Sequence, residues 1–502
     1  MLNIKEYLQY SELAFASYAE NLATGASNTA KYKLAKMSDA RAVRFNASWK
    51  VLAQQDLADG FSAVLFERVN EAGAPTGEKV LGIRGTDSGT DYLTDVVNIA
   101  GLGTNRGASQ YNSLETFYQS LITNGKLGVS EQIAVTGHSL GGFLAQAFTA
   151  EHDAVVSATY TYNSPGFSVV PGLISNVGTE LLELFGITDA TISNNKIFNV
   201  RAMGGLSATA GLGQMMGSVQ PIWTETGDAT HNHSIVTVTD ALALYDLFAR
   251  LDPGLDIGQI DAILRGASNR MNNTLEKTLQ ALAKLVLDSG ASIGIDDRNA
   301  FYRALIPLRD AVGNASYAIT PGNVVAPLTS MSAASLASLA ALNTPTGMAY
   351  RYALQELNPF AVVSNANLYD QHNANGELDL YDPQTGDGSL TDQYLIDRAA
   401  LLAEFNQPNL ADNNPASGVI QIAGDVLYQD KKSGYKIVGN DLFLSDHKKI
   451  LFGDDRADSF SGGDKADHLY GGKGDDTLLS TDGSHRAHLI PRVCQSGIFI
   501  VH

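Results

Sequence analysis

A serine in a glycine-rich turn is the residue of this chain best suited to nucleophilic chemistry. The segment 133–147 reads IAVTGHSLGGFLAQA, in which a β-branched apolar run precedes Ser139 and helix-forming residues follow it. This order predicts a strand, a sharp turn at Ser139 and a helix, with the serine hydroxyl exposed at the turn. A Gly-x-Ser-x-Gly match alone is weak, because 48 of the 502 residues are glycine. The strand–turn–helix context makes Ser139 the predicted nucleophile; an ordinary tight turn is the alternative.

A serine nucleophile needs a base that takes its proton, and histidine is the usual choice. His231 and His233 lie in the segment THNHSI, after a predicted strand around 220–224 and directly before a predicted helix. We favour His233, because it lies against the start of that helix; His231 is the functional alternative, and a surface histidine at a helix cap is the non-catalytic one. His372 is a third candidate. The remaining histidines are less suitable: His138 lies inside the serine turn, His152 directly follows its helix, and the others, such as His447 and His468, lie toward the C-terminus.

The second chemical signal is a nine-residue repeat. Three consecutive copies occupy 453–461, 462–470 and 471–479, with aspartate always at position six and an apolar residue at position eight. Glycine turns with a repeated carboxylate supply oxygen ligands to Ca²⁺, while the apolar residue packs inward in a parallel β-roll. The alternative is a solvated, acidic linker. The predicted ligands are the side chains of Asp455, Asp458, Asp464, Asp467 and Asp476, with the backbone of Gly453, Gly462 and Gly471.

The elements around Ser139 alternate between strands and helices. This alternation predicts an α/β fold with a mainly parallel sheet. Helices are expected near the N-terminus, at 108–124 and at 235–251. Strands are expected at 61–66, 79–87, 133–138, 154–162, 196–201 and 220–224.

The length and patterning of the chain predict three regions. Residues 1–251 form the predicted catalytic domain, 252–435 a helical and loop-rich middle region, and 436–502 the β-roll and tail. Helical patterns in the middle region occur at 273–288, 298–312 and 330–342, without a catalytic constellation. The glycine-rich segment 203–218 is either a mobile segment near the site or a connection without function.

Composition excludes several classes of protein. The net charge of −19 argues against nucleic acid as a partner, because binding phosphates needs a basic surface. The chain contains no run of eighteen apolar residues, so the sequence predicts no transmembrane helix. Residues 1–20 lack the pattern of a signal peptide. The single cysteine, Cys494, excludes an internal disulfide framework.

Four short segments follow one another along the first half of the chain. They are IRGT at 83–86, GHSLGG at 137–142, YNSPG at 162–166 and HSI at 233–235. Their order and spacing resemble those of class 3 lipases, α/β-hydrolases that cleave carboxylic esters of lipids. With the nonapeptides, the chain resembles bacterial lipases and phospholipases that carry RTX calcium-binding repeats and leave the cell by type I secretion. The resemblance covers about 60–250 and 439–480.

The resemblance implies a set of roles. Ser139 is the nucleophile, His233 the base, and the backbone N–H groups of Thr86 and Leu140 form the oxyanion hole. Structural Ca²⁺ in the repeats is the implied cofactor, with no organic cofactor. A lipid or ester substrate at an interface and the type I secretion machinery are the implied partners, and the implied location is extracellular, without an N-terminal signal peptide.

The chain departs from the family at the catalytic acid. The family places an aspartate soon after the strand at 196–201, but the loop 202–209 contains no carboxylate. Asp228 and Glu225 are possible substitutes, and Asp189 is a more distant one. The acid orients the imidazole, so a serine–histidine dyad without it would be slower by up to about ten-thousand-fold.

The extreme C-terminus also departs from the pattern. Residues 484–494 are basic, whereas 498–501 resemble the apolar end of a type I export signal. The resulting hypothesis is a secreted serine hydrolase acting on acylglycerols or related esters. A phospholipase is the first alternative, and a calcium-dependent surface or adhesion protein with a degenerate hydrolase domain is the second.

Overall fold

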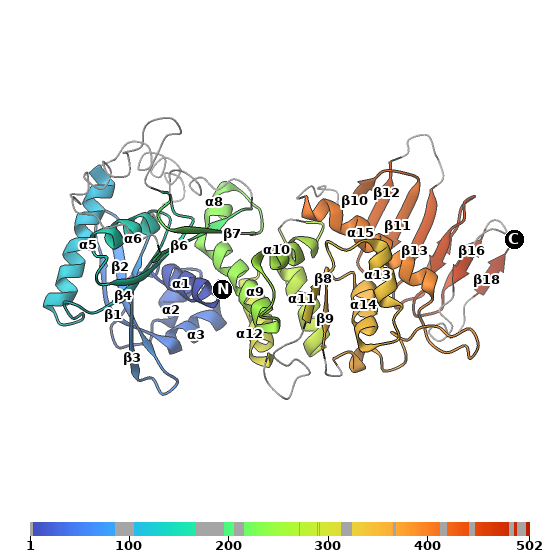
Figure 1. Cartoon of the computed structure of the whole chain (residues 1–502), viewed down its shortest axis with the longest axis horizontal. Helices are drawn as coiled ribbons and strands as arrows, with labels where there is room; N and C mark the ends of the chain where they lie inside the picture. The colour runs from blue at the N-terminus through green and yellow to red at the C-terminus, as the bar shows by residue number, and fades with distance from the viewer. Residues whose placement is uncertain are drawn as a thin grey trace. The chain divides into compact units, whose positions relative to one another are not determined.

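The structure is a computed structural model, shown in Figure 1. Two compact units divide the chain: Met1–Asp246 with Asp297–Arg303, and Leu247–Asp296 with Ala304–His502. No helix of the described part is long and apolar enough to cross a membrane. The described residues are 4–85, 105–166, 195–204, 215–270, 272–288, 290, 292–312, 324–364, 368–411, 419–440, 447–480, 486–488 and 498–501.

A seven-stranded sheet forms the centre of the first unit, and its strands lie in chain order. The first three strands pair antiparallel, and the pairs from β3 to β7 are parallel. The predicted α/β fold with a mainly parallel sheet is therefore confirmed. The strands are β1 (Trp49–Asp56), β2 (Ser62–Val69), β3 (Pro75–Ile83), β4 (Ile133–His138), β5 (Val156–Tyr162), β6 (Ile197–Ala202) and β7 (Ser218–Ile222).

Helices cover both faces of this sheet, which explains why every residue of β4 is buried. Val135 belongs to the apolar core that also contains residues of two helices, α5 (Asn105–Thr123) and α6 (Leu140–Glu151). The next residue, Thr136, faces the other way and donates to the Tyr10 carbonyl of α1 (Ile4–Ala16) at 3.0 Å. The unit also contains α2 (Thr29–Leu34), α3 (Asp39–Ser48), α8 (Ala229–His233) and the first part of α9 (Ile235–Leu251).

The second unit begins with helices. The predicted helices of the middle region correspond to α11 (Thr274–Leu287), α12 (Arg298–Ala311) and α13 (Ala333–Ala340); α12 starts in the segment assigned to the first unit. The sequence did not predict α14 (Pro345–Glu356) or α15 (Asp392–Leu410). In α15 a charged residue occupies a core position and interrupts the apolar pattern that would have predicted the helix. This residue is Arg398, which is 1% exposed and donates to Asp430 at 2.6 Å. The other elements are α10 (Ile257–Gly266), β8 (Val324–Pro327), β9 (Phe360–Val363) and the 3₁₀ helix η1 (Asp370–His372).

A parallel β-roll completes the second unit and confirms the prediction from the repeats. From β13 onward the strands alternate between two sheets. In the pairs β13–β15, β14–β16 and β15–β17 the paired residues lie eighteen positions apart, as Ile450 and His468 do. The position-eight residues Leu451, Phe460, Leu469 and Leu478 form the core between the sheets. The strands are β10 (Val419–Ile422), β11 (Val426–Asp430), β12 (Tyr435–Gly439), β13 (Lys448–Phe452), β14 (Ser459–Ser461), β15 (His468–Tyr470), β16 (Thr477–Ser480), β17 (Arg486–His488) and β18 (Ile498–Val501).

The two units do not decide the predicted domain boundaries. The first unit ends at Asp246 and includes Asp297–Arg303 of the predicted middle region, and the second unit contains the rest of the chain. The sheet that leads into the roll starts at Val419, ahead of the predicted boundary at 436. The three predicted domains stay predictions.

Candidate active site and calcium-binding repeats

Ser139 occupies the strained turn that the sequence predicted. It lies between the end of β4 and the start of α6, with φ 60° and ψ −128°. A residue with a side chain pays roughly 1–3 kcal/mol for such a backbone conformation. The fold holds it there: the Ser139 N–H donates to the Tyr162 carbonyl at 2.9 Å, and its carbonyl accepts from Gly142 N at 3.0 Å.

Two glycines of the motif are explained by the space around them. A Cβ at Gly137 would clash with the backbone of Gly141, and a Cβ at Gly141 would clash with the carbonyl of Ile83. The turn therefore needs both glycines so that three segments of backbone can approach one another.

The serine hydroxyl is not exposed as the motif suggested. Ser139 is 0% exposed, and the segment that follows β3 packs against it: a Cβ at Gly85 would lie 3.0 Å from the Ser139 Cβ. Among the described residues, Ser139 Oγ has no hydrogen-bond partner. A nucleophile and its base are often apart in a hydrolase without substrate.

His233 lies beside this turn. It is the last residue of α8, which follows β7, and its ring centroid is 4.7 Å from that of His138, the neighbour of Ser139. His233 is 3% exposed. Burial, and secondarily His138, hold the pKa of His233 well below its usual value. The imidazole is therefore neutral at pH 7, the state that a general base requires.

A hydrogen-bond network that the sequence did not reveal holds the His233 backbone. The His233 carbonyl accepts from His138 Nε2 at 2.7 Å and from Asn163 Nδ2 at 3.0 Å. Because a carbonyl only accepts, His138 carries its hydrogen on Nε2, and its Nδ1 accepts from the Tyr18 hydroxyl at 2.7 Å. Burial lowers the pKa of His138 to about 4, so this arrangement persists at neutral pH. Tyr18, His138 and Asn163 are therefore positioning residues.

The predicted acids lie in different places. Asp228 is exposed and caps α8 by accepting from His231 N at 2.8 Å. Glu225 is buried, at 6% exposure. Asp189 lies outside the described residues. Asp228 as the catalytic acid stays a prediction.

One of the two predicted oxyanion donors can be placed. Leu140 is the first residue of α6, where backbone N–H groups have no partner within the helix and carry partial positive charge. Its N–H is therefore available close to the serine. Thr86 and residues 205–214 of the glycine-rich segment lie outside the described residues.

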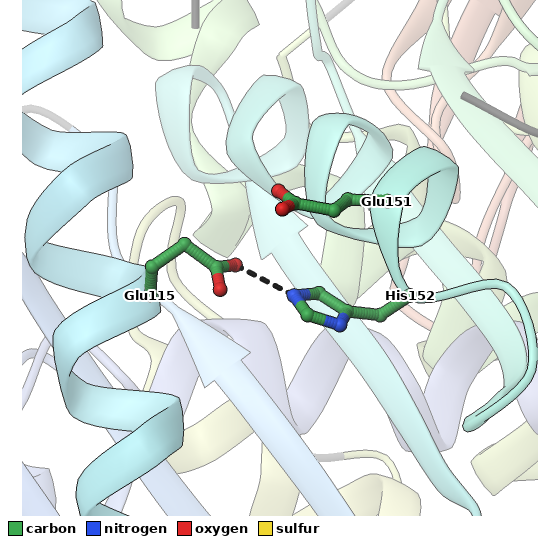
Figure 2. A group of neighbouring side chains, drawn as sticks. All are labelled: Glu115, Glu151 and His152. Carbon is green, nitrogen blue, oxygen red and sulfur yellow. Dashed lines mark hydrogen bonds and ion pairs between the residues drawn. The ribbon is translucent and has the colours of Figure 1, made fainter. Parts of the chain in front are cut away.

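Other histidines have structural partners. His152 pairs with Glu115 of α5 at 2.8 Å, with Glu151 beside it, as Figure 2 shows. The helix α6 separates it from Ser139 by roughly 20 Å, at about 1.5 Å per residue. In the second unit, His372 lies against the Tyr352 ring at 4.7 Å and contacts the Leu285 carbonyl at 3.1 Å.

The repeats place the position-six aspartates in stacked turns, close to backbone carbonyl oxygens. Asp458, Asp467 and Asp476 are at most 6% exposed, whereas Asp455 and Asp464, at position three, are exposed. Gly453 lies directly against the Gly471 carbonyl of the stacked turn, where a Cβ would clash. A donor set of buried carboxylates and backbone carbonyls fits Ca²⁺, which prefers six to eight oxygen ligands.

A comparison with protein families identifies the C-terminal repeats. The model of the RTX calcium-binding nonapeptide repeat (4 copies) matches residues 452–484. No curated protein matches the chain in sequence.

Several solved lipases are similar in structure. Lipase II from Rhizopus niveus is 15% identical, over 40% of this chain and 71% of that one, with a TM-score of 0.27. Lip2 from Yarrowia lipolytica is 17% identical, over 44% of this chain and 78% of that one, with a TM-score of 0.27. The extracellular lipase LipA from Serratia marcescens is 14% identical, over 96% of this chain and 65% of that one, with a TM-score of 0.23. All three TM-scores are below 0.5, so these similarities carry no argument about the fold. The strand order and the serine turn of this chain identify it. The chain combines an α/β-hydrolase fold with a C-terminal RTX-type calcium-binding repeat region.

Proposed function

We propose that this chain is a secreted serine hydrolase that cleaves carboxylic esters of lipids. The observation that carries the proposal is the backbone of Ser139, held at φ 60° between a parallel strand and a helix, with buried His233 beside it. Natural chains retain such strain where the conformation serves a site.

The proposed reaction proceeds in two steps. Ser139 Oγ attacks the ester carbonyl while His233 takes the hydroxyl proton, and His233 then gives that proton to the departing alcohol. The Leu140 N–H stabilises the negative charge on the carbonyl oxygen during the attack. Water, deprotonated by the same histidine, releases the acid from the acyl-enzyme and restores Ser139.

The burial of the site favours this chemistry. Ser139 and His233 are at most 3% exposed, so water is largely excluded, and hydrogen bonds to a developing charge are stronger there. Substrate reaches the hydroxyl only after the side chains that cover it move.

The repeats support an extracellular location. Their oxygen ligands suit the millimolar Ca²⁺ found outside cells, since calcium sites of extracellular modules bind with dissociation constants of about 10⁻⁴–10⁻³ M. Export by the type I machinery is the route that we propose for a chain with this C-terminal region.

The test is the variant Ser139→Ala. We expect hydrolysis of p-nitrophenyl esters to fall by at least about a thousand-fold, because the nucleophile is removed. The matched control is Ser157→Ala, at the opposite end of the neighbouring strand, where the hydroxyl donates to the Ile133 carbonyl. Undiminished hydrolysis by Ser139→Ala would refute the proposal.

Two further assays define the activity. A fluorophosphonate probe should label the wild type and not Ser139→Ala; absence of labelling in the wild type would indicate a non-enzymatic role. Comparing fatty-acid release from triacylglycerol and from phosphatidylcholine separates a lipase from a phospholipase.

A further inference from the structure

Both edges of the β-roll begin with a lysine whose ammonium group contacts the oxygen atoms of a repeat turn. We define the first edge by the turns 453–458 and 471–476, and the second edge by the turn 462–467. Lys431 lies at the start of the first edge and Lys449 at the start of the second. The two lysines and the aspartates around them indicate which turns can hold Ca²⁺.

On the first edge two aspartates are stacked. Asp458 and Asp476 are both buried, and the Asp458 N–H donates to Asp476 Oδ1 at 2.9 Å. The strands that follow these turns pair in parallel, with Ser459 opposite Thr477. This edge therefore offers carboxylates from two successive turns to one cation, the arrangement that a calcium ion needs to replace its water ligands.

On the second edge a lysine takes the place of one aspartate. Lys449 N donates to Asp467 Oδ1 at 2.7 Å, the same bond that Asp458 makes with Asp476. Lys449 lies nine residues before Asp458, at position six of the preceding nine residues. In the other direction, the residue eighteen positions after Asp467 is His485. Neither neighbour of Asp467 in this register is acidic.

The Lys449 ammonium also reaches the turn where a cation would bind. Its Nζ donates to the carbonyl of Ser461 at 3.2 Å and to that of Gly462 at 3.1 Å. Backbone carbonyls of such turns are neutral ligands for Ca²⁺. The lysine thus replaces a carboxylate ligand and supplies a positive charge beside these carbonyls.

Lys431 supplies a positive charge on the first edge from a different position, that of the first glycine of a repeat, and its ammonium contacts a carboxylate. Its N–H donates to the Phe452 carbonyl at 2.9 Å, as Gly453 N–H does to the Tyr470 carbonyl one rung later. Its Nζ lies 2.7 Å from Asp458 Oδ1 and 4.9 Å from the centroid of the Phe460 ring. A buried carboxylate needs a partner of opposite charge, and this ammonium provides one to Asp458.

We propose that Lys431 and Lys449 are built-in cations that order the first turns of the roll without Ca²⁺. It follows that, among the turns that the structure describes, one calcium site is built from two aspartates, Asp458 and Asp476, and that the turn 462–467 holds no such site. A cation attached to the chain is always present at its site, so it starts the roll at any calcium concentration. This proposal does not depend on the activity of Ser139.

The first test counts bound calcium in the full-length protein by equilibrium dialysis. Asp476→Asn should bind one Ca²⁺ fewer than the wild type. Asp467→Asn is the matched control, with the same residue type at the same repeat position and equal burial, and it should bind the wild-type number. Equal losses from both variants, or no loss from Asp476→Asn, would overturn the proposal.

The second test removes the ammonium groups and does not depend on aspartate variants that fail to fold. The double variant Lys431→Met, Lys449→Met should lower the melting temperature of the second unit by roughly 2–4 °C in chelator. The same decrease should persist in saturating Ca²⁺. The control is Lys448→Met, one residue earlier on the opposite face of β13, which should melt as the wild type does. An unchanged melting temperature of the double variant, or a decrease that Ca²⁺ abolishes, would show that the lysines do not replace the ion.

Discussion

The serine turn and the β-roll both bury polar groups, but they satisfy them by different means. At the serine turn, neutral His138 bridges the Tyr18 hydroxyl and the His233 carbonyl, and the Ser139 backbone bonds to its neighbours. In the roll, by contrast, buried carboxylates face one another or a lysine ammonium, as Asp458 does with Lys431. Neutral hydrogen bonds form from the chain alone, whereas stacked carboxylates need a cation. The hydrogen bonds that hold the serine turn therefore form as the chain folds, whereas the roll depends on its ionic surroundings.

Removing calcium should separate the two regions most strongly. Saturating Ca²⁺ at 100–1,000 times its dissociation constant stabilises the folded state by about 3–4 kcal/mol, so chelation should lower the melting temperature of the second unit by roughly 10 °C. The rate at which a fluorophosphonate labels Ser139 should not change. Calorimetry and labelling with and without chelator test this. A parallel loss of labelling would show that the serine turn also depends on the ion.

Lowering the pH should act on the serine turn. The pKa of His138 is about 4 in the folded chain and about 6.5 when unfolded. Above pH 6.5 both states are neutral, so the stability is fully present. Below it the unfolded chain binds a proton that the folded chain does not, and up to about 3 kcal/mol is lost as the pH falls toward 4. Melting curves of the first unit between pH 7 and 4 measure the loss.

Variants make the pH experiment specific. His138→Asn should reduce the pH dependence to the part that buried His233 contributes, because the pKa of His233 is also lowered, whereas His447→Asn, in the second unit, should leave the pH dependence unchanged. The lowered pKa of His233 also predicts that the acid limb of kcat/KM lies below pH 6.5. An acid limb at or above pH 6.5 would contradict the neutral, buried base.

The smallest expected effect concerns backbone strain. Ser139→Gly should be more stable than Ser139→Ala by about 1 kcal/mol, because both lack the hydroxyl but only glycine adopts φ 60° without strain. Urea unfolding of the first unit measures the difference. The pair Ser157→Gly and Ser157→Ala, within a regular strand, should show the opposite order, and equal stability at position 139 would mean that the turn stores little strain.

The sequence predicted what depends on local pattern. The serine turn, α5 and α9 follow from apolar periodicity and glycine spacing, and the structure places them within a few residues of their expected bounds. The nonapeptide repeat likewise predicted a parallel β-roll, without bounds for its strands. Glycine spacing was informative because Gly137 and Gly141 leave room for neighbouring backbone.

What the sequence could not predict depends on contacts between distant residues. Tyr18 lies 120 residues before its partner His138, and no spacing rule connects them. The helix α15 was missed because Arg398 is buried by a partner 32 residues away. Lys449 stands nine residues before Asp458, but no glycine turn marks that position as part of the repeat, and the strand register shows that it occupies an aspartate position.

The register of the roll also constrains how its length can change. Paired residues are eighteen positions apart, so two nonapeptides complete one coil. Inserting or deleting a single nonapeptide between the paired turns would move every later aspartate to the opposite edge and separate Asp476 from Asp458. A gain or loss of two nonapeptides preserves the edges. A tandem duplication in this region therefore keeps each aspartate on its own edge only when it adds a multiple of eighteen residues, even though the sequence repeats every nine.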